Sequence, residues 1–349
     1  MFIIGREGSN PFFRSLKPPE LLFLGFSKNR KERIVSLSKK IAVINDLSGF
    51  GRCSLTAAIP VISAMGIQVC PLPTAILSAQ TGFPDYYCDT CSEYLTIFTE
   101  KWKAMDVSFD GIYTGFTTDA AQAYGMIDFI DSFRTDATHV LVDPILGDDG
   151  VKYKLFSDEV CDAIKALTDH ATVITPNLTE LCILTGTDYA SLDHGNWERL
   201  QEQTAAVCAD LSARTGLSLL VTGICHKSDL ESDWDFSDEE YSQVSGSTGA
   251  DTSVFFNEGV NAIATGVYTD GKWSVCDAPL LPGSFSGTGD LFASVIIAAV
   301  VNGCSLTGAV RLAQDFLTEA IGHSIKAHVY PPDGTDFEPF LSMLMPYAK

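Results

Sequence analysis

From Lys40 onward, short runs of β-branched and other apolar residues alternate with longer stretches that have the periodicity of amphipathic helices. This alternation is typical of α/β proteins, in which a mostly parallel sheet is covered by helices on both faces. The predicted strands of that sheet are Ile41–Asn45, Gln68–Pro71, Gly111–Thr114, Val140–Asp143, Thr172–Thr175 and Ser218–Thr222. The sequence therefore predicts a three-layer α/β/α sandwich with a mostly parallel central sheet.

Amphipathic patterns predict the helices that cover this sheet. They are Ser54–Met65, Tyr124–Phe133, Ser157–Leu167, Leu178–Leu184, Trp197–Ala213, Asp290–Val301 and Thr307–Ala327. Near the end of the chain, Asp270-Gly271 separates two further strand patterns, Asn261–Tyr268 and Trp273–Asp277. An Asp-Gly pair between strands is a strong hairpin signal, so we expect an antiparallel pair at this end of the sheet.

The charge of the chain is strongly acidic and unevenly distributed. The 349 residues include 23 Lys and Arg against 44 Asp and Glu, a formal net charge of −21. Residues 1–40 contain nine basic and three acidic residues, a net +6, so the remaining 309 residues carry −27. An acidic surface repels phosphate backbones and anionic lipids, which disfavours nucleic acid and membranes as partners. We expect the partner to be a small molecule or an anion shielded by a metal ion.

The basic segment at residues 1–38 is predicted to lie outside the fold. It has no sustained periodicity, and its apolar patch at Leu21–Phe26 is far shorter than the ~20 residues that span a bilayer. A disordered extension or a start codon placed too far upstream is favoured over an Arg-rich organelle leader. Residues 39–349 then form a single domain, interrupted at about 226–258 by an acidic surface insertion for which a mobile flap is the alternative.

Ten cysteines are scattered through the chain, mostly within apolar runs. Free cysteines in that context behave as small buried hydrophobic residues. They indicate a reducing compartment, and we expect the protein to be cytoplasmic.

A glycine-rich loop carries the strongest chemical signal. The segment Gly283–Asp290 is followed by an apolar helix pattern, and its glycines at 287 and 289 allow a tight turn. Such a turn brings the amides of Gly287, Thr288 and Gly289 to a helix start, where N–H groups and the helix dipole favour an anion. Asp290 then stands on the first helical turn and can accept a proton from a substrate hydroxyl. The alternative role of Asp290 is that of a helix cap.

Polar clusters follow two of the predicted strands, at Asp143–Asp148 and at Thr175–Glu180. Ligands of open α/β sheets bind at the carboxyl ends of the strands, where both clusters lie. Asp143, Asn177 and Glu180 are hard oxygen ligands suited to a hydrated Mg²⁺ shared with nucleotide phosphates. Capping of the turns that follow is the alternative for Asp143 and Asn177.

The first predicted strand runs into a glycine loop at Asn45–Gly51. This loop differs from a dinucleotide-binding fingerprint, because Ser54 stands where the third glycine belongs and the second strand ends without an acid for the ribose. The chain also has no GxxxxGK[ST] sequence, which excludes a P-loop. We interpret the loop as a wall that a small ligand approaches closely.

Six motifs follow one another along the chain: Asn45–Gly51, Gln80–Phe83, Tyr113–Phe116, Asp143–Asp148, Thr175–Glu180 and Gly287–Asp290. Taken in this order, they resemble the motifs of the pyridoxal kinases of the ribokinase-like superfamily, the pyridoxal/pyridoxamine kinase family. The resemblance covers essentially all of residues 40–330. It implies transfer of the ATP γ-phosphoryl group to the 5′-hydroxymethyl group of pyridoxal, pyridoxamine or pyridoxine, and it implies a homodimer.

The resemblance also implies roles for individual residues. Asp290 would be the base, and the amides of Gly287–Gly289, including Thr288, would form the anion hole. Ser48 and Thr81 would hydrogen-bond the pyridine ring. Phe116 stands where relatives commonly carry Tyr, so it would stack on the ring without offering a hydroxyl.

The resemblance implies that the other motifs bind the nucleotide and its cations. Asp143, Thr175 and Glu180 would organise Mg²⁺ and a monovalent cation such as K⁺. Asp148 and Asn177 would lie near the phosphates of ATP. Thr222 and Gly223 would line the nucleotide side, and Leu280–Ser284 the adenine pocket.

Three alternatives stay open at the level of the sequence. Hydroxymethylpyrimidine kinases share the superfamily, but their glycine loop typically ends in Cys where this chain has Asp290. A sugar kinase would need a second Gly-Gly loop near the start, which is absent. A non-catalytic vitamin-binding protein could use the same pocket without needing Asp290. The loop after Ser48, Phe116 and the acidic insertion depart from the family pattern and leave vitamer preference open.

Overall fold

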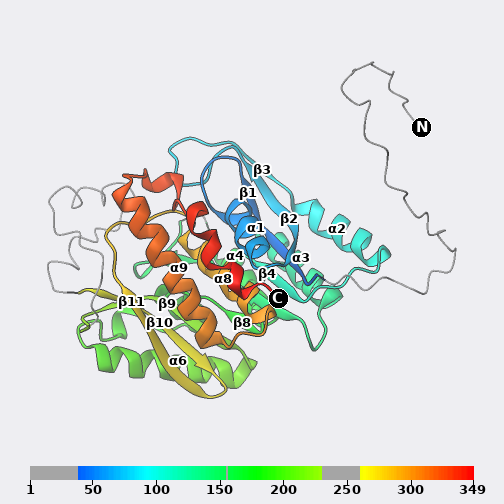
Figure 1. Cartoon of the computed structure of the whole chain (residues 1–349). Coiled ribbons are helices and arrows are strands. Elements are labelled where there is room, and N and C mark those ends of the chain that lie inside the picture. The colour runs from blue at the N-terminus through cyan, green and yellow to red at the C-terminus, as the bar shows by residue number, and fades with distance from the viewer. Residues whose placement is uncertain (1–37, 155, 230–259) are drawn as a thin grey trace, which may run out of the picture. The chain divides into compact units, whose positions relative to one another are not determined.

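The computed structural model describes residues 38–154, 156–229 and 260–349. The described residues from Ser38 to Lys349 belong to one compact unit (Figure 1). Nearly all of the predicted basic extension, and the acidic insertion from residue 230 onward, lie outside the described residues. The insertion connects β9 (Ser218–His226) to β10 (Ala262–Thr269), two neighbouring antiparallel strands.

A sheet of nine strands, counted over the described residues, forms the central layer in the order β11-β10-β9-β8-β5-β4-β1-β2-β3. The remaining strands are β1 (Lys40–Ser48), β2 (Gln68–Leu77), β3 (Cys88–Thr90), β4 (Gly111–Thr114), β5 (His139–Val142), β8 (Val173–Ile174) and β11 (Lys272–Pro279). Strands β9, β8, β5, β4, β1 and β2 run parallel, whereas β3, β10 and β11 are antiparallel to their neighbours. The carboxyl ends of six parallel strands therefore meet at one edge.

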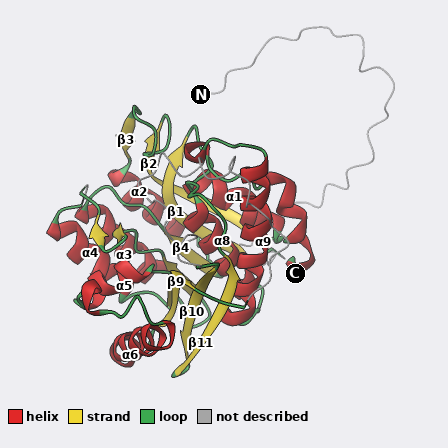
Figure 2. Ribbon diagram, turned by 90° about the vertical axis from the view of Figure 1, so that its left-hand side faces the viewer, coloured by secondary structure: helices red, strands yellow, loops and turns green. Residues whose placement is uncertain are grey.

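Helices cover both faces of the sheet, which Figure 2 shows between its two helical layers. One layer contains α1 (Ser54–Ala64), α8 (Thr288–Val301) and α9 (Leu306–Lys326). The other contains α2 (Ser92–Ala104), α3 (Ala120–Phe133), α4 (Asp158–Thr168), α5 (Leu178–Thr185) and α6 (Trp197–Thr215). The predicted three-layer α/β/α fold is confirmed.

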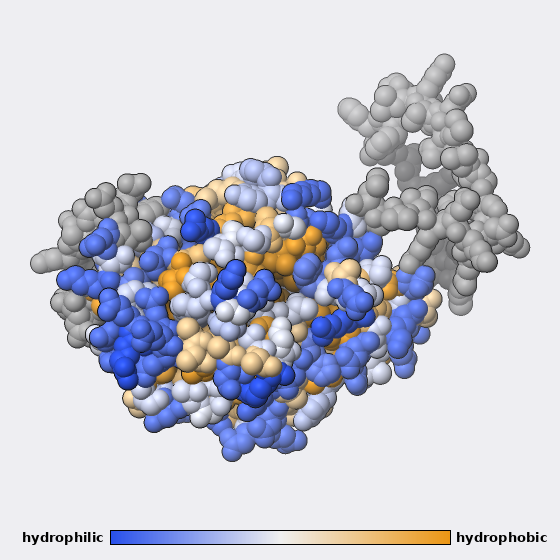
Figure 3. Space-filling model, turned by 90° about the horizontal axis from the view of Figure 1, so that it is seen from below, coloured by the Kyte–Doolittle hydropathy of each residue, from blue (hydrophilic) through white to orange (hydrophobic). Residues whose placement is uncertain are grey.

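Two apolar cores explain why the sequence forms this sandwich. Successive side chains of a strand point to opposite faces, so Ile41 and Val43 of β1 pack in the core with α1, α8 and α9. Ala42 and Ile44 pack in the core on the opposite face. A parallel sheet buried on both faces needs such continuous apolar strands. The face of the molecule in Figure 3 carries hydrophilic side chains mostly around its rim, whereas apolar side chains gather towards its centre.

All the strands and helices predicted above are present, with ends that differ by up to six residues, the largest difference being at the end of β2. Helix α2 was not predicted, because Leu95 is its one buried residue and the apolar pattern is weak. The short hairpin of β6 (Gly147–Asp148) and β7 (Val151–Lys152) was also not predicted. Among the described helices, none is long and apolar enough to cross a membrane. All ten cysteines are free thiols.

Candidate active site

A cavity of about 560 Å³ lies at the carboxyl ends of β5, β8 and β9 and beside the start of α8. Its volume is in the range of sites for small molecules and cofactors, and its position is where open parallel sheets bind ligands. Its lining includes these residues with sequence-predicted roles: Asp143, Asp148, Thr175, Asn177, Glu180, Thr222, Gly223, Gly287, Thr288, Gly289 and Asp290. The structure thus brings together the predicted catalytic, nucleotide and metal residues.

The two ends of this cavity differ in chemistry. One end presents the carboxylates of Asp143, Asp148 and Asp290. The other is lined by apolar side chains that include Leu281, Leu317 and Ile321. The predicted adenine stretch, Leu280–Ser284, contributes to this apolar end. A ligand with a flat apolar group and an anionic tail fits this division where the amides at the start of α8 and a bound cation offset the carboxylates.

The backbone around Gly287 forms the start of α8. Gly287 is the N-cap with a φ of 80°, in the left-handed region that favours glycine. A Cβ atom at this position would collide with the carbonyl oxygen of Arg52 in the loop after β1. Because the first N–H groups of a helix have no partner within it, those of Thr288 and Gly289 remain available to an anion in the cavity.

Asp290 follows these amides and is held from three directions. Asn45 Nδ2 donates to Asp290 Oδ1 over 2.9 Å, and the Tyr113 hydroxyl donates to the same oxygen over 3.3 Å. The N–H of Ser54, at the start of α1, also donates to the Asp290 carboxylate. Burial raises the pKa of Tyr113, so its hydroxyl keeps its proton and acts as a donor. The carboxylate is therefore fixed in position while part of its surface faces the cavity.

The orientation of Asn45 is itself fixed. Its side chain is 0% exposed, and its Oδ1 accepts the N–H of Asp46 over 3.0 Å and that of Phe116 over 2.8 Å. The amide nitrogen must then point to Asp290. Gly115 makes this arrangement possible, because a Cβ atom there would collide with the Asn45 carboxamide.

The surroundings of Asp290 tune its acidity. Burial raises its pKa to about 6, and the nearby Asp46 carboxylate adds to the rise. The hydrogen bonds from Ser54, Asn45 and Tyr113 stabilise the ionised carboxylate and therefore lower the pKa of Asp290, which limits the rise. A carboxylate with a pKa just below neutral is mostly ionised at pH 7 and still basic enough to accept a proton.

The predicted metal residues form a pair of carboxylates beside Asp290. Thr175 Oγ1 donates to Asp143 Oδ1 over 2.9 Å. Burial raises the pKa of Asp143 to about 7, with a further rise from Asp290. Burial likewise raises the pKa of Glu180 to about 8, with a further rise from Asp143. These carboxylates repel one another, and a bound cation would relieve that repulsion.

The donor set fits a magnesium ion that keeps most of its water. Among the described residues, no group of three or more His, Cys, Asp or Glu side chains is arranged to hold a metal. Mg²⁺ commonly binds through one or two carboxylates and completes its shell with water and substrate phosphates. Asp143 and Glu180 provide such a pair of carboxylates in the wall of the cavity.

Asn177 and Glu180 also have a structural role. Asn177 caps α5 by accepting the N–H of Glu180 over 2.8 Å, and Glu180 Oε2 accepts the N–H of Asn177 over 2.8 Å. This is a capping box. Asn177 Nδ2 also donates to the carbonyl oxygen of Gly147, at the β6–β7 hairpin that carries Asp148. The capping role considered for Asn177 is present, and the same contacts fix these residues at the cavity wall.

The three predicted ring-binding residues do not line this cavity. Ser48 is 0% exposed, and its hydroxyl donates to Asp46 Oδ2 over 2.8 Å. Thr81 is exposed and Phe116 is half-buried. Ser48 ends β1, Thr81 follows β2 and Phe116 follows β4, and these three strands are neighbours in the sheet. The cavity lies instead at the ends of β5, β8 and β9. Asp290 bonds to side chains of β1 and β4 and so lies between the two groups. The ring contacts stay predictions.

Sequence reasoning gave no role to Asn45, Tyr113 or Ser54. Asn45 gave a detectable signal, since it is the first polar residue after an apolar run within β1. Tyr113 reads as an ordinary core residue of β4, and Ser54 acts through its backbone. Their function depends on helix α8, which lies more than 170 residues further along the chain.

The family model described as phosphomethylpyrimidine kinase matches residues 44–254 and 257–331. The chain belongs to this kinase family. One solved structure is that of a Bacteroides thetaiotaomicron protein, described as a "putative phosphomethylpyrimidine kinase" and crystallised with pyridoxal. It is 31% identical to this chain with a TM-score of 0.73, and the match covers 88% of this chain and 96% of that one. The expected kinase class and the resemblance to the pyridoxal kinases of the ribokinase-like superfamily are confirmed.

Two further relatives carry the pyridoxal kinase name. The crystal structure of pyridoxal kinase from Lactobacillus plantarum is 25% identical with a TM-score of 0.69, covering 89% of this chain and 98% of that one. A curated "Putative pyridoxal kinase" of Schizosaccharomyces pombe is 22% identical over 271 residues, which are 76% of this chain and 75% of that protein.

Proposed function

We propose that this protein transfers the γ-phosphoryl group of ATP to the 5′-hydroxymethyl group of pyridoxal, pyridoxamine or pyridoxine. The observation that carries the proposal is the placement of Asp290. Its carboxylate, fixed by Asn45 and Tyr113, stands beside the free amides of α8 at the polar end of the cavity. The pyridoxal bound to the Bacteroides relative supports the choice of acceptor.

The proposed reaction uses Asp290 as the general base. The carboxylate accepts the proton of the 5′-hydroxyl group as the hydroxyl oxygen attacks the γ-phosphorus of ATP. The bond from the γ-phosphorus to the bridging oxygen breaks, and ADP leaves with that oxygen and its electron pair. The amides at Gly287–Gly289 donate to the charge on the transferred group.

Asp143 and Glu180, with Thr175 beside them, would hold Mg²⁺, and a monovalent cation such as K⁺ is proposed for the same group. When bound, these cations supply positive charge that neutralises the phosphates. Thr222, Gly223, Asp148 and Asn177 would face the nucleotide. In this proposal the ATP phosphates contact backbone amides and cations that the carboxylates hold. An acidic protein can therefore bind ATP.

Three further features belong to the proposal. We propose a homodimer, a cytoplasmic location, and a single kinase domain at residues 39–349. Residues 1–38 would take no part in the chemistry. Equal turnover by the full chain and by a chain that begins at Lys39 would support this last point, and loss of turnover would contradict it.

The deciding experiment compares four acceptors with MgATP under identical conditions: pyridoxal, pyridoxamine, pyridoxine and hydroxymethylpyrimidine. We expect phosphorylation of at least one B6 vitamer with a higher kcat/KM than for the pyrimidine. The description of the matching family favours the pyrimidine as the second candidate. Preference for the pyrimidine would establish that alternative, and binding of a vitamer without turnover would indicate a binding protein.

A further inference from the structure

A buried glutamine joins the loops on both sides of the proposed reaction centre. Gln80, in the loop after β2, is 6% exposed. Its Nε2 donates to Ser286 Oγ over 3.0 Å and to the carbonyl oxygen of Pro332 over 2.8 Å. Its Oε1 accepts the N–H of Gly82 over 2.6 Å. All the polar atoms of this carboxamide are used in links to other residues.

The backbone of Gln80 adds a link to the loop after β1. Its N–H donates to the carbonyl oxygen of Phe50 over 3.0 Å. Gly51 has a φ of 101°, and a Cβ atom there would lie 2.7 Å from Cγ of Gln80. Four segments therefore converge on this residue: the loops after β1 and β2, the anion loop (residues 283–289), and a C-terminal strap (residues 330–338).

The strap is itself tied to the same loops. The N–H of Ser286 donates to the Pro331 carbonyl oxygen over 3.2 Å, and the N–H of Arg52 donates to the Asp333 carbonyl oxygen over 2.9 Å. The Arg52 guanidinium pairs with Asp336 and with Glu338, each at 2.9 Å. The strap thus crosses from the anion loop to the loop after β1.

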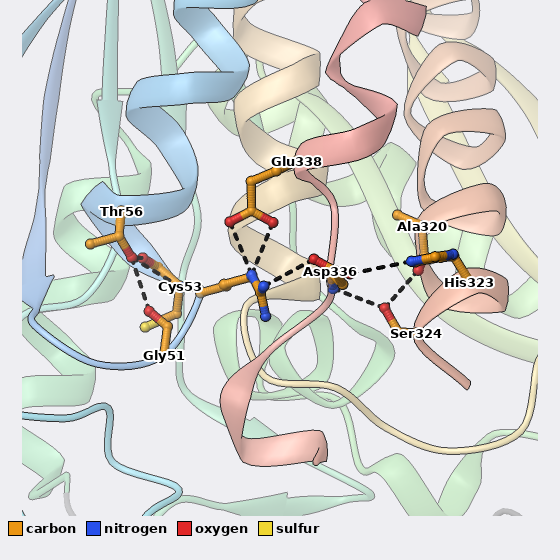
Figure 4. A network of polar contacts seen from close by, with 9 residues as sticks. Gly51, Cys53, Thr56, Ala320, His323, Ser324, Asp336 and Glu338 are labelled. Atoms are coloured by element: carbon orange, nitrogen blue, oxygen red, sulfur yellow. Dashed lines mark hydrogen bonds and ion pairs between the residues drawn. The ribbon is translucent and has the colours of Figure 1, made fainter. Parts of the chain in front are cut away.

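Helix α9 anchors the far side of the strap. Figure 4 shows Asp336 between Cys53 on one side and His323 and Ser324 of helix α9 on the other. Asp336 Oδ2 lies 3.2 Å from His323 Nε2, and the Asp336 N–H donates to Ser324 Oγ over 2.8 Å. The strap therefore has a fixed outer attachment on helix α9, and its inner attachments are Gln80, Ser286 and Arg52.

We propose that Gln80 is a positioning residue, which fixes the anion loop against the loops of the acceptor side. The proposal rests on the proposed phosphoryl transfer. The amides of the anion loop stabilise charge only if they lie at the right place, and misplacement by about 1 Å is enough to cost roughly 100-fold in rate. Glutamine suits this position because one planar amide supplies two donated bonds and one accepted bond.

Two substitutions separate the donors from the shape of the side chain. Gln80→Met keeps the length of the side chain and removes all three hydrogen bonds. Gln80→Glu keeps the shape but turns an acceptor toward Ser286 and the Pro332 carbonyl. Because Gln80 does not line the cavity, we expect kcat to fall about tenfold or more in both variants while KM for ATP changes less than about threefold.

Asn302 offers a matched control at the opposite end of α8. It is 2% exposed, and its Nδ2 donates to the carbonyl oxygens of Met65 and Tyr347 over 2.9 and 3.0 Å. Asn302→Leu removes a comparable buried carboxamide far from the anion loop. We expect it to lower the unfolding temperature as Gln80→Met does, with kcat within about twofold of the wild type.

Hydrogen exchange supplies a readout that does not depend on turnover. We expect faster exchange of the amides at residues 285–290 in Gln80→Met than in the wild type, and no such change in Asn302→Leu. Ser286→Ala removes one acceptor of the Gln80 amide and should raise the same exchange, which keeps the test decisive if Gln80→Met does not fold.

The outcomes distinguish the two proposals. Unchanged exchange at residues 285–290, or a kcat loss no larger than that of Asn302→Leu, would overturn the positioning role of Gln80. A wild-type chain that phosphorylates none of the four acceptors would instead overturn the proposed function, and the exchange comparison would still decide what Gln80 does to the loop.

Discussion

Replacing Asp290 by asparagine removes both the proposed general base and a buried negative charge, and these two losses affect different quantities, turnover and stability. Asp290→Asn keeps the shape of the side chain and an oxygen that can accept the hydrogen bonds from Asn45 and Tyr113. The amide cannot take a proton from the acceptor hydroxyl. We expect kcat to fall by ~10² or more, as for the loss of a general base.

The same substitution should stabilise the fold. The pKa of Asp290 is raised from 3.8 to about 6, chiefly by burial. At 1.36 kcal/mol for each pKa unit, the ionised carboxylate costs the folded state up to about 3 kcal/mol at neutral pH. Contact with the solvent of the cavity screens this cost, so we expect a gain of about 1–3 kcal/mol. A gain of that size raises Tm by several degrees.

The pH dependence follows from the direction of the shift. A raised pKa means that the folded state binds this proton more tightly than the unfolded state does, so the wild type loses stability as pH rises from about 4 to about 6. The neutral amide does not titrate. The stability advantage of Asp290→Asn should therefore be absent near pH 4 and complete above about pH 7. Wild-type turnover should fall as pH drops through about 6, where Asp290 becomes protonated.

The assay combines ADP release with MgATP and pyridoxal and urea unfolding without ligands at acidic and neutral pH. Asp128→Asn, an exposed position on α3, is the matched control and should change neither quantity appreciably. Near-normal turnover of Asp290→Asn would refute its role as the base. A variant no more stable than the wild type at neutral pH would refute the electrostatic argument.

Three further substitutions test other parts of the site. Asn45→Ala should lower kcat about tenfold and move the acid limb of the pH–rate profile upward, because its hydrogen bond lowers the pKa of Asp290. Gly287→Ala should abolish turnover, because the added Cβ atom would collide with the backbone of Arg52. Gly216→Ala is the matched control, since Gly216 also has a positive φ, of 77°, but has open space around it. This control should lose only about 1 kcal/mol of stability in thermal unfolding and should keep its kcat. Asp143→Asn is tested by stripping the protein of metal with a chelator and then titrating Mg²⁺ back. The Mg²⁺ concentration that gives half the maximal rate should rise about tenfold. An unchanged value would show that Asp143 is not a metal ligand.

Much of the fold could be predicted from the sequence because its signals are local. A strand such as Ile41–Asn45 and the helix after it differ in the period of their apolar residues, and that period is set by backbone geometry within a few residues. Local signals also predicted residues that line the cavity, because Asp143, Asn177 and Gly287 each follow a strand or precede a helix in a recognisable motif. Helix α2 was missed because its apolar signal is too weak.

The residues that contact Asp290 are brought together by the three-dimensional packing of distant segments. The contact from Asn45 joins residues 245 apart, and the contact from Gln80 to Pro332 joins residues 252 apart. Such contacts leave no local pattern, because they depend on how strands pair and how helices pack on the sheet. Local residue patterns were sufficient to predict the three layers and the polar residues that line the cavity. The packing of α8 and the C-terminal strap against the loops after β1 and β2 decided what holds the proposed base and the anion loop in place.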